Sequence, residues 1–100
     1  MLIELNNIIE KDLRNLSAKE FLNLICSLLK KGELKKEVFV SDRYDGRTGR
    51  VDILYKLDGL TYGIELDRFS PRNKSIFKLN KLNPDFKLVI TRSPVKIHSY

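Results

Sequence analysis

The sequence has very few residues that could form a disulfide or bind zinc. Its 100 residues include one cysteine, Cys26, and one histidine, His98. A single cysteine cannot form a disulfide within the chain, and this Cys and His cannot supply the four ligands of an ordinary structural zinc site. We therefore expect a protein that needs no oxidising compartment, with Cys26 serving as a small buried hydrophobic residue.

Long hydrophobic runs are also missing. The longest apolar stretch, within residues 21–29, is interrupted by Asn23 and Ser27, so we expect no transmembrane helix. The amino terminus carries Glu4 and Glu10 without a basic start, which does not fit a secretory signal peptide. These features favour an intracellular, cytoplasmic protein that has no membrane partner.

The composition is that of a small globular protein with a modest positive charge. Hydrophobic residues make up 42% and charged residues 32% of the chain, so we expect residues 1–100 to form a single folded domain. Lys and Arg number 19 and Asp and Glu 13, which gives a net charge of +6. This surplus favours a polyanionic partner, and nucleic acid first.

Hydrophobic periodicity predicts two helices and four strands. Ser17 and Glu20 form a capping box that begins a helix over residues 17–31, which ends before Gly32. Three strands follow, over residues 37–40, 50–56 and 61–67, and then a helix over 70–82 and a strand over 86–91. Because the last connection passes through a helix, the fourth strand is expected to run parallel to one of the other three. The predicted class is therefore α/β (α+β), with a mixed four-stranded sheet flanked by helices.

Three acids fall where a predicted hairpin would bring them together. Glu65 and Asp67 share one face of the third strand, and the turn at Asp58-Gly59 places Asp52 of the second strand opposite them. Clustered carboxylates repel one another unless a cation compensates, and their oxygens suit Mg²⁺ or Mn²⁺. The alternative is that they are solvent-facing acids on an exposed sheet, paired with Arg50, Lys56 or Arg68.

The order of elements and the position of the acids resemble the PD-(D/E)XK nuclease superfamily over about residues 17–91. The matching segments are Arg50-Val51-Asp52-Ile53-Leu54 and Gly63-Ile64-Glu65-Leu66-Asp67, and Val51 replaces the proline of the motif. The resemblance implies a restriction-endonuclease-like αβββαβ core and Mg²⁺-dependent hydrolysis of DNA. It also implies that Asp52 and Glu65 hold the metal, helped by the backbone carbonyl of Leu66.

Asp67 stands where the superfamily usually has a lysine that orients the attacking water and stabilises charge at the phosphate. Three interpretations remain open. Asp67 is a third metal ligand, or a basic residue reaches in from Arg68, Lys74 or Lys78, or the chain is a catalytically inactive nucleic-acid-binding or regulatory module. Some members add an acid from the first helix, which would be Glu20 here, although the capping box already explains that residue.

Basic residues flank the predicted acidic site on both sides. Lys74, Lys78 and Lys81 share one face of the second helix, preceded by Arg68 and Arg72, and the loop before the second strand supplies Arg43, Arg47 and Arg50. They are candidates for phosphate contacts, with an ordinary solvated surface as the alternative.

So short a chain resembles small phage, mobile-element and junction-resolving members of the superfamily. We expect it to act on DNA rather than RNA, as a homodimer or on a junction, flap or nick.

Overall fold

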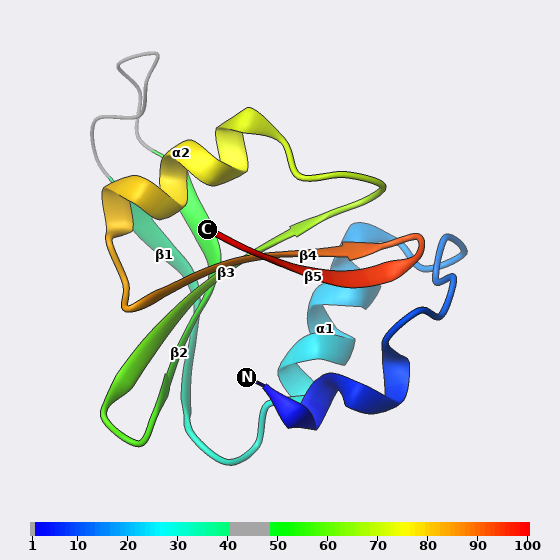
Figure 1. Cartoon of the computed structure of the whole chain (residues 1–100), viewed down its shortest axis with the longest axis horizontal. Helices are drawn as coiled ribbons and strands as arrows, with labels where there is room; N and C mark the ends of the chain where they lie inside the picture. The colour runs from blue at the N-terminus through cyan, green and yellow to red at the C-terminus, as the bar shows by residue number, and fades with distance from the viewer. Residues whose placement is uncertain (1, 41–48) are drawn as a thin grey trace.

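The computed structural model describes residues 2–40 and 49–100, which form one mixed sheet with helices on both faces (Figure 1). The elements in chain order are η1 Ile3–Ile8, α1 Ala18–Leu28, β1 Glu33–Val40, β2 Gly49–Leu57, β3 Leu60–Asp67, α2 Asn73–Leu82, β4 Phe86–Arg92 and β5 Val95–Ser99. The predicted loop that contains Arg43 and Arg47 lies outside the described residues. No helix in the described ranges has the length and apolar character needed to cross a membrane.

The strands lie in the order in which they occur in the sequence, β1-β2-β3-β4-β5. All neighbours are antiparallel except β3 and β4, which are parallel and are joined through α2. Asp58 and Gly59 both have positive φ, 53° and 79°, and they form the tight turn of the β2–β3 hairpin. The predicted meander and the helical crossover to a parallel strand are therefore confirmed.

The prediction of four strands is wrong, because residues 95–99 add a fifth. β5 pairs antiparallel with β4, from Arg92 opposite Val95 to Leu88 opposite Ser99. This segment has only five residues, of which Val95 and Ile97 alternate with polar ones and pack in the core, and pairing with β4 completes the strand. β1 also begins at Glu33 and not at Glu37. Its Lys35-Lys36 pair, which looks like a solvated connection, is typical of an exposed edge strand.

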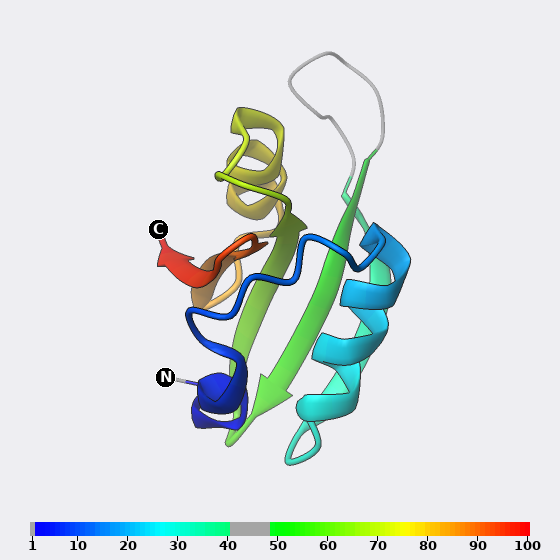
Figure 2. The ribbon, with the colours of Figure 1, turned by 90° about the vertical axis from the view of Figure 1, so that its right-hand side faces the viewer.

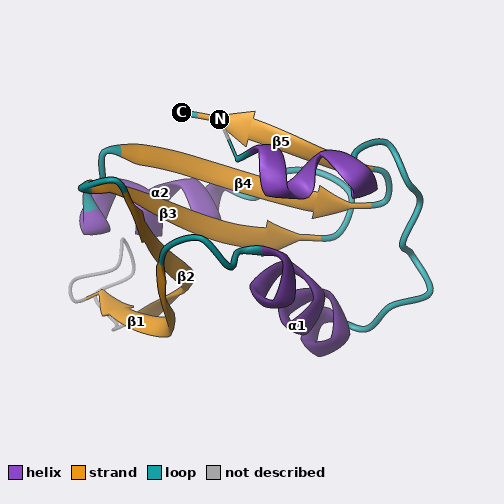
Figure 3. Cartoon of the chain, turned by 90° about the horizontal axis from the view of Figure 1, so that it is seen from below, coloured by secondary structure: helices purple, strands orange, loops and turns teal. Residues whose placement is uncertain are grey.

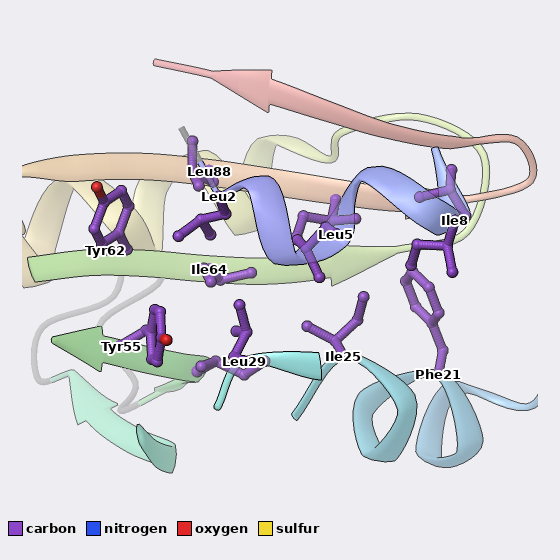
Figure 4. Packing of buried hydrophobic residues seen from close by; sticks show 13 residues of the cluster. Leu2, Leu5, Ile8, Phe21, Ile25, Leu29, Tyr55, Tyr62, Ile64 and Leu88 are labelled. Carbon is purple, nitrogen blue, oxygen red and sulfur yellow. The ribbon is translucent and has the colours of Figure 1, made fainter. Parts of the chain in front are cut away.

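The larger part of the core lies between α1, η1 and one face of the sheet. Phe21 and Ile25 of α1 point toward Leu5 and Ile8 of η1, and Ile64 of β3 lies between Leu2 and Leu29 in this view (Figure 4). The capping box is present, since the Ser17 hydroxyl accepts a hydrogen bond from Glu20 N and the Glu20 carboxylate accepts one from Ser17 N. Viewed from below, α1 and η1 cover the near face, while α2 lies behind the sheet (Figure 3).

The opposite face of the sheet is covered by α2, which packs against a smaller cluster of Val40, Val51, Leu79 and Val89. The helix lies close to β3 because Gly63 has no side chain. A Cβ at that position would lie 2.7 Å from Pro84 Cγ and 3.1 Å from Leu79 Cδ2. The distance between α2 and the sheet is therefore set by a glycine that sits two residues before Glu65.

The close approach at Gly63 predicts that Gly63→Ala destabilises the protein. The added methyl group must displace the Pro84 ring or the helix, and such overpacking costs about 1 to 3 kcal/mol. Urea unfolding followed by circular dichroism measures the change. Lys56→Ala, at an exposed position on β2, is the control and should unfold at nearly the wild-type midpoint. Equal midpoints for the two variants would contradict the packing described here.

Candidate functional site

Two neighbouring strands separate where the predicted acids lie. β2 and β3 are paired from Leu57–Leu60 only as far as Ile53–Ile64. Beyond that point β2 continues beside β1, while β3 continues beside β4 as far as Asp67. Figure 2 shows the two strands diverging toward the upper end of the sheet. Asp52 and Glu65 are the first residues after the last pair, so they stand at the start of this fork.

The carboxylates of Asp52 and Glu65 replace the missing backbone pairing. Asp52 N donates to Glu65 Oε2 at 2.8 Å, and Leu66 N donates to Asp52 Oδ2 at 2.8 Å. Each side chain thus accepts a hydrogen bond from the backbone of the opposite strand. This reciprocal arrangement, which we call the carboxylate clasp, satisfies two amides that the fork would otherwise leave without partners.

Lys78 of α2 provides the positive charge beside the clasp. Its Nζ lies 2.6 Å from Glu65 Oε1 and donates to the carbonyl oxygen of Arg50 at 2.9 Å. The Lys78 side chain is 14% exposed and that of Glu65 is 1% exposed, so the pair is largely shielded from water. Of the three basic residues considered for the position of the motif lysine, Lys78 is the one that reaches the carboxylates.

The surroundings of Glu65 favour its neutral form. Burial, together with the charge of Asp52, raises the pKa of Glu65 to about 7, although Lys78 acts in the opposite direction. A buried carboxylate beside a second one is held in its ionised form only at a cost in free energy. Lys78 therefore compensates only part of the negative charge of the two carboxylates.

Asp67 does not join Asp52 and Glu65 but anchors the start of α2. Its carboxylate accepts hydrogen bonds from Arg72 N at 2.9 Å, from Arg72 Nε at 2.8 Å and from the Ser75 hydroxyl at 2.9 Å. The chain turns back at this point, because β3 ends at Asp67 and α2 begins six residues later. Within residues 2–40 and 49–100, no three or more acidic, His or Cys side chains are grouped so that they could hold a metal ion.

A cleft of about 640 Å³ opens beside the clasp. Asp52 lines it, whereas Glu65 is buried and does not. Among the described residues of the lining, positive charge dominates, with five cations and two acids: Lys19, Lys36, Arg72, Lys78, Arg92, Glu37 and Asp52. Sequence reasoning missed Lys19, Lys36 and Arg92 because they come from three different elements, and no spacing along the chain brings them together.

The other predicted residues lie away from the cleft or have local partners. The Arg68 guanidinium stacks on the ring of Phe69 and that of Arg50 on the ring of Phe39, each at 4.7 Å from the ring centroid. Lys74 and Lys81 are exposed on α2. Glu20 is held by the capping box, with Ser17 N donating to Glu20 Oε1 at 2.8 Å.

The donors at the fork fit a hard divalent cation. Asp52 Oδ2 accepts the Leu66 amide, which leaves Oδ1 without a hydrogen bond from the described residues, on a side chain that lines the cleft. Mg²⁺ is commonly bound by one or two carboxylates together with water and substrate phosphates. Asp52 could therefore hold such an ion, with Glu65 and the Leu66 carbonyl as further donors.

The raised pKa of Glu65 predicts a pH-dependent stability. Its pKa is about 7 in the folded protein against an ordinary 4.5, so the free energy of unfolding should fall as the pH rises from 4.5 to 7. The total loss is about 3 kcal/mol. Glu65→Gln removes this titration, so its stability relative to wild type should increase by that amount between about pH 4 and pH 8. Urea unfolding across this range measures it.

Glu33→Gln, at the exposed start of β1, is the control for the pH experiment and should follow the wild-type profile. Parallel pH profiles for Glu65→Gln and the wild type would show that Glu65 titrates normally in the folded protein.

Comparison of the chain with models of protein families, with curated proteins and with solved structures gives no match. The resemblance to the PD-(D/E)XK superfamily therefore depends on the order of the elements and on the positions of Asp52 and Glu65.

Proposed function

We propose that the protein is a metal-dependent nuclease that hydrolyses phosphodiester bonds at the carboxylate clasp. The observation that carries this proposal is the position of Asp52, which is clasped to Glu65 and also lines a cleft dominated by cations. Clustered carboxylates alone would suit a cation, and clustered cations alone would suit a polyanion. A carboxylate pair within a positively charged cleft suits a phosphodiester and a metal ion together.

Each group has a separate task in this proposal. Asp52 and Glu65 would hold Mg²⁺ or Mn²⁺, an ion that would polarise the phosphodiester and activate water for its hydrolysis. Lys78 favours the ionised form of Glu65 through the contact at 2.6 Å, and its charge would stabilise negative charge that develops at the phosphate. Lys78 thereby supplies from α2 the cation that Asp67 cannot supply from β3.

The finer features of the proposed activity stay predictions. They are a preference for DNA over RNA, a preference for a junction, flap or nick, and action as a homodimer. So are the phosphate contacts expected of Arg43, Arg47, Arg50, Arg68, Arg72, Lys74, Lys78 and Lys81.

A second candidate function is a nucleic-acid-binding module without catalysis. It is favoured by one observation, namely that both oxygens of Glu65 already have partners, Asp52 N and Lys78 Nζ. Under this interpretation the clasp is a structural device, and the cleft binds a polyanion in a salt-sensitive way without need of a metal.

Replacing the acids or the lysine of the clasp separates these two functions. With Mg²⁺ or Mn²⁺, Asp52→Asn and Glu65→Gln should each reduce cleavage at least about a hundredfold, because each change weakens the hold on the ion. Lys78→Met should reduce cleavage to a similar degree. The assay is a panel of labelled single-stranded, duplex, flap and four-way-junction DNA, together with a single-stranded RNA.

Lys56→Met is the matched control, since it removes the same charge from an exposed position on β2 that does not line the cleft. It should cleave like the wild type, and circular dichroism checks that every variant is folded. Cleavage that survives both Asp52→Asn and Glu65→Gln would refute the assignment. A wild-type protein that binds the panel but cuts none of it would favour the binding module.

Asp67→Asn tests whether the third acid is a metal ligand or an anchor for α2. The contacts with Arg72 and Ser75 predict a loss of about 1 to 2 kcal/mol in the free energy of unfolding, because a charged acceptor is lost. Cleavage at a temperature where the variant is folded should be close to that of the wild type. A loss of cleavage comparable to that of Asp52→Asn, without a loss of stability, would restore the three-carboxylate interpretation.

A further inference from the structure

The cations that line the cleft fall into two groups according to their partners. Lys78 is paired with Glu65 and Arg72 with Asp67. Lys19 of α1, Lys36 of β1 and Arg92 of β4 make no ion pair with any acid in the described part of the chain. Asp52 and Glu37, the acids in the lining, therefore do not neutralise these three cations. We call Lys19, Lys36 and Arg92 the open cations.

Among the open cations, Arg92 is the one with a buried donor that has no hydrogen-bond partner in the described part of the chain. Its Nε is buried and has no hydrogen-bond partner within the described residues. Burying a donor of a charged group without an acceptor is unfavourable, and here the group stands at the end of β4, where it lines the cleft. An anion in the cleft would supply the acceptor, and a guanidinium binds phosphate oxygens especially well because its donors form a planar fork.

The other two open cations lie on elements that flank the cleft. Lys19 stands in the first turn of α1, where the aligned peptide dipoles add to its positive charge. Lys36 lies on β1 and lines the same cleft as Asp52, with which it forms no ion pair.

We propose that Lys19, Lys36 and Arg92 bind the phosphates of a nucleic-acid strand that lies through the cleft past Asp52. The choice of nucleic acid as the ligand rests on the proposed function. The residues that bind the strand in this inference are different from the cations of α2 and of the predicted arginine loop. The phosphates of the strand then meet three separate elements, α1, β1 and β4, which carry these cations. The apolar side chains in the lining, Ala18, Leu22 and Leu66, then lie beside its sugars and bases.

Binding without a divalent metal tests the proposal independently of cleavage. Fluorescence anisotropy with a short labelled single-stranded DNA, in EDTA, gives the dissociation constant over a series of salt concentrations. Lys19→Gln, Lys36→Gln and Arg92→Gln should each weaken binding several-fold and reduce the slope of log Kd against log salt by about 0.7. The triple variant should reduce that slope by about 2.

The chain offers a matched control for each kind of change. Lys35→Gln alters the neighbour of Lys36 on the same strand, and Lys96→Gln alters an exposed lysine on the strand beside Arg92. Neither residue lines the cleft, so both variants should bind with nearly the wild-type affinity and salt slope. Arg92→Lys keeps the charge but loses the fork, and it should recover part of the affinity that Arg92→Gln loses.

Each outcome of this experiment has a definite consequence. The proposal is overturned if the control variants lose as much affinity as the cleft variants, if the cleft variants bind like the wild type, or if poly-glutamate competes as well as DNA. The last result would identify an acidic peptide as the ligand.

The proposed nuclease activity fails separately from this inference. If the wild type cuts nothing while the cleft variants lose binding as described, the inference stands without the activity. If the wild type cuts and the cleft variants show an unchanged KM, the activity stands and the inference falls.

Discussion

The structure depends on the way in which two separating strands keep their backbone amides satisfied. Where β2 leaves β3, the amides of Asp52 and Leu66 are bonded by the carboxylates of Glu65 and Asp52 across the fork. A buried amide without an acceptor costs about 1 to 3 kcal/mol. The fork therefore needs, at these two positions, side-chain acceptors that are long enough to reach the opposite strand. Of the same two side chains, Asp52 lines the adjoining cleft and Glu65 is buried. The two residues that satisfy these backbone amides are thus also the two that the sequence predicts as metal ligands.

α2 is held against the fork by contacts along its whole length. Asp67 fixes its beginning through Arg72 and Ser75, Lys78 ties its middle to Glu65 and to the Arg50 carbonyl, and Gly63 allows it to approach the sheet. The two acids of the Glu65-Leu66-Asp67 segment therefore have different tasks, although they share a face of β3. Asp67 anchors the start of the helix, and Glu65 forms an ion pair with Lys78 of the helix.

Much of this arrangement follows from local patterns in the sequence. The capping box at Ser17, the Asp58-Gly59 turn and the helix before the last long strand predict α1, the hairpin and the parallel crossover, because each is decided by neighbouring residues. β5 and the first half of β1 are different, since they are strands through pairing with partners elsewhere in the chain. The task of Asp67 could not be read from the E-x-D spacing, which indicates a face but not the Arg72 that folds back onto it. Likewise, Lys36 and Arg92 meet at one cleft only after the sheet has formed.

The distribution of charge around the fork is poorly explained by stability alone. Glu65 is buried beside a second acid, and burial together with the charge of that acid raises its pKa to about 7, so the folded state loses free energy when this group ionises. Three cations stand in the adjoining cleft, and none of them is paired with Asp52 or Glu37. A chain selected only for stability would bring these opposite charges together or replace them with apolar residues. Keeping acids and cations unpaired within one cleft is useful when the cleft receives ligands that carry both signs of charge. A metal ion and a phosphodiester together meet that requirement, because the ion satisfies the carboxylates and the phosphates satisfy the cations.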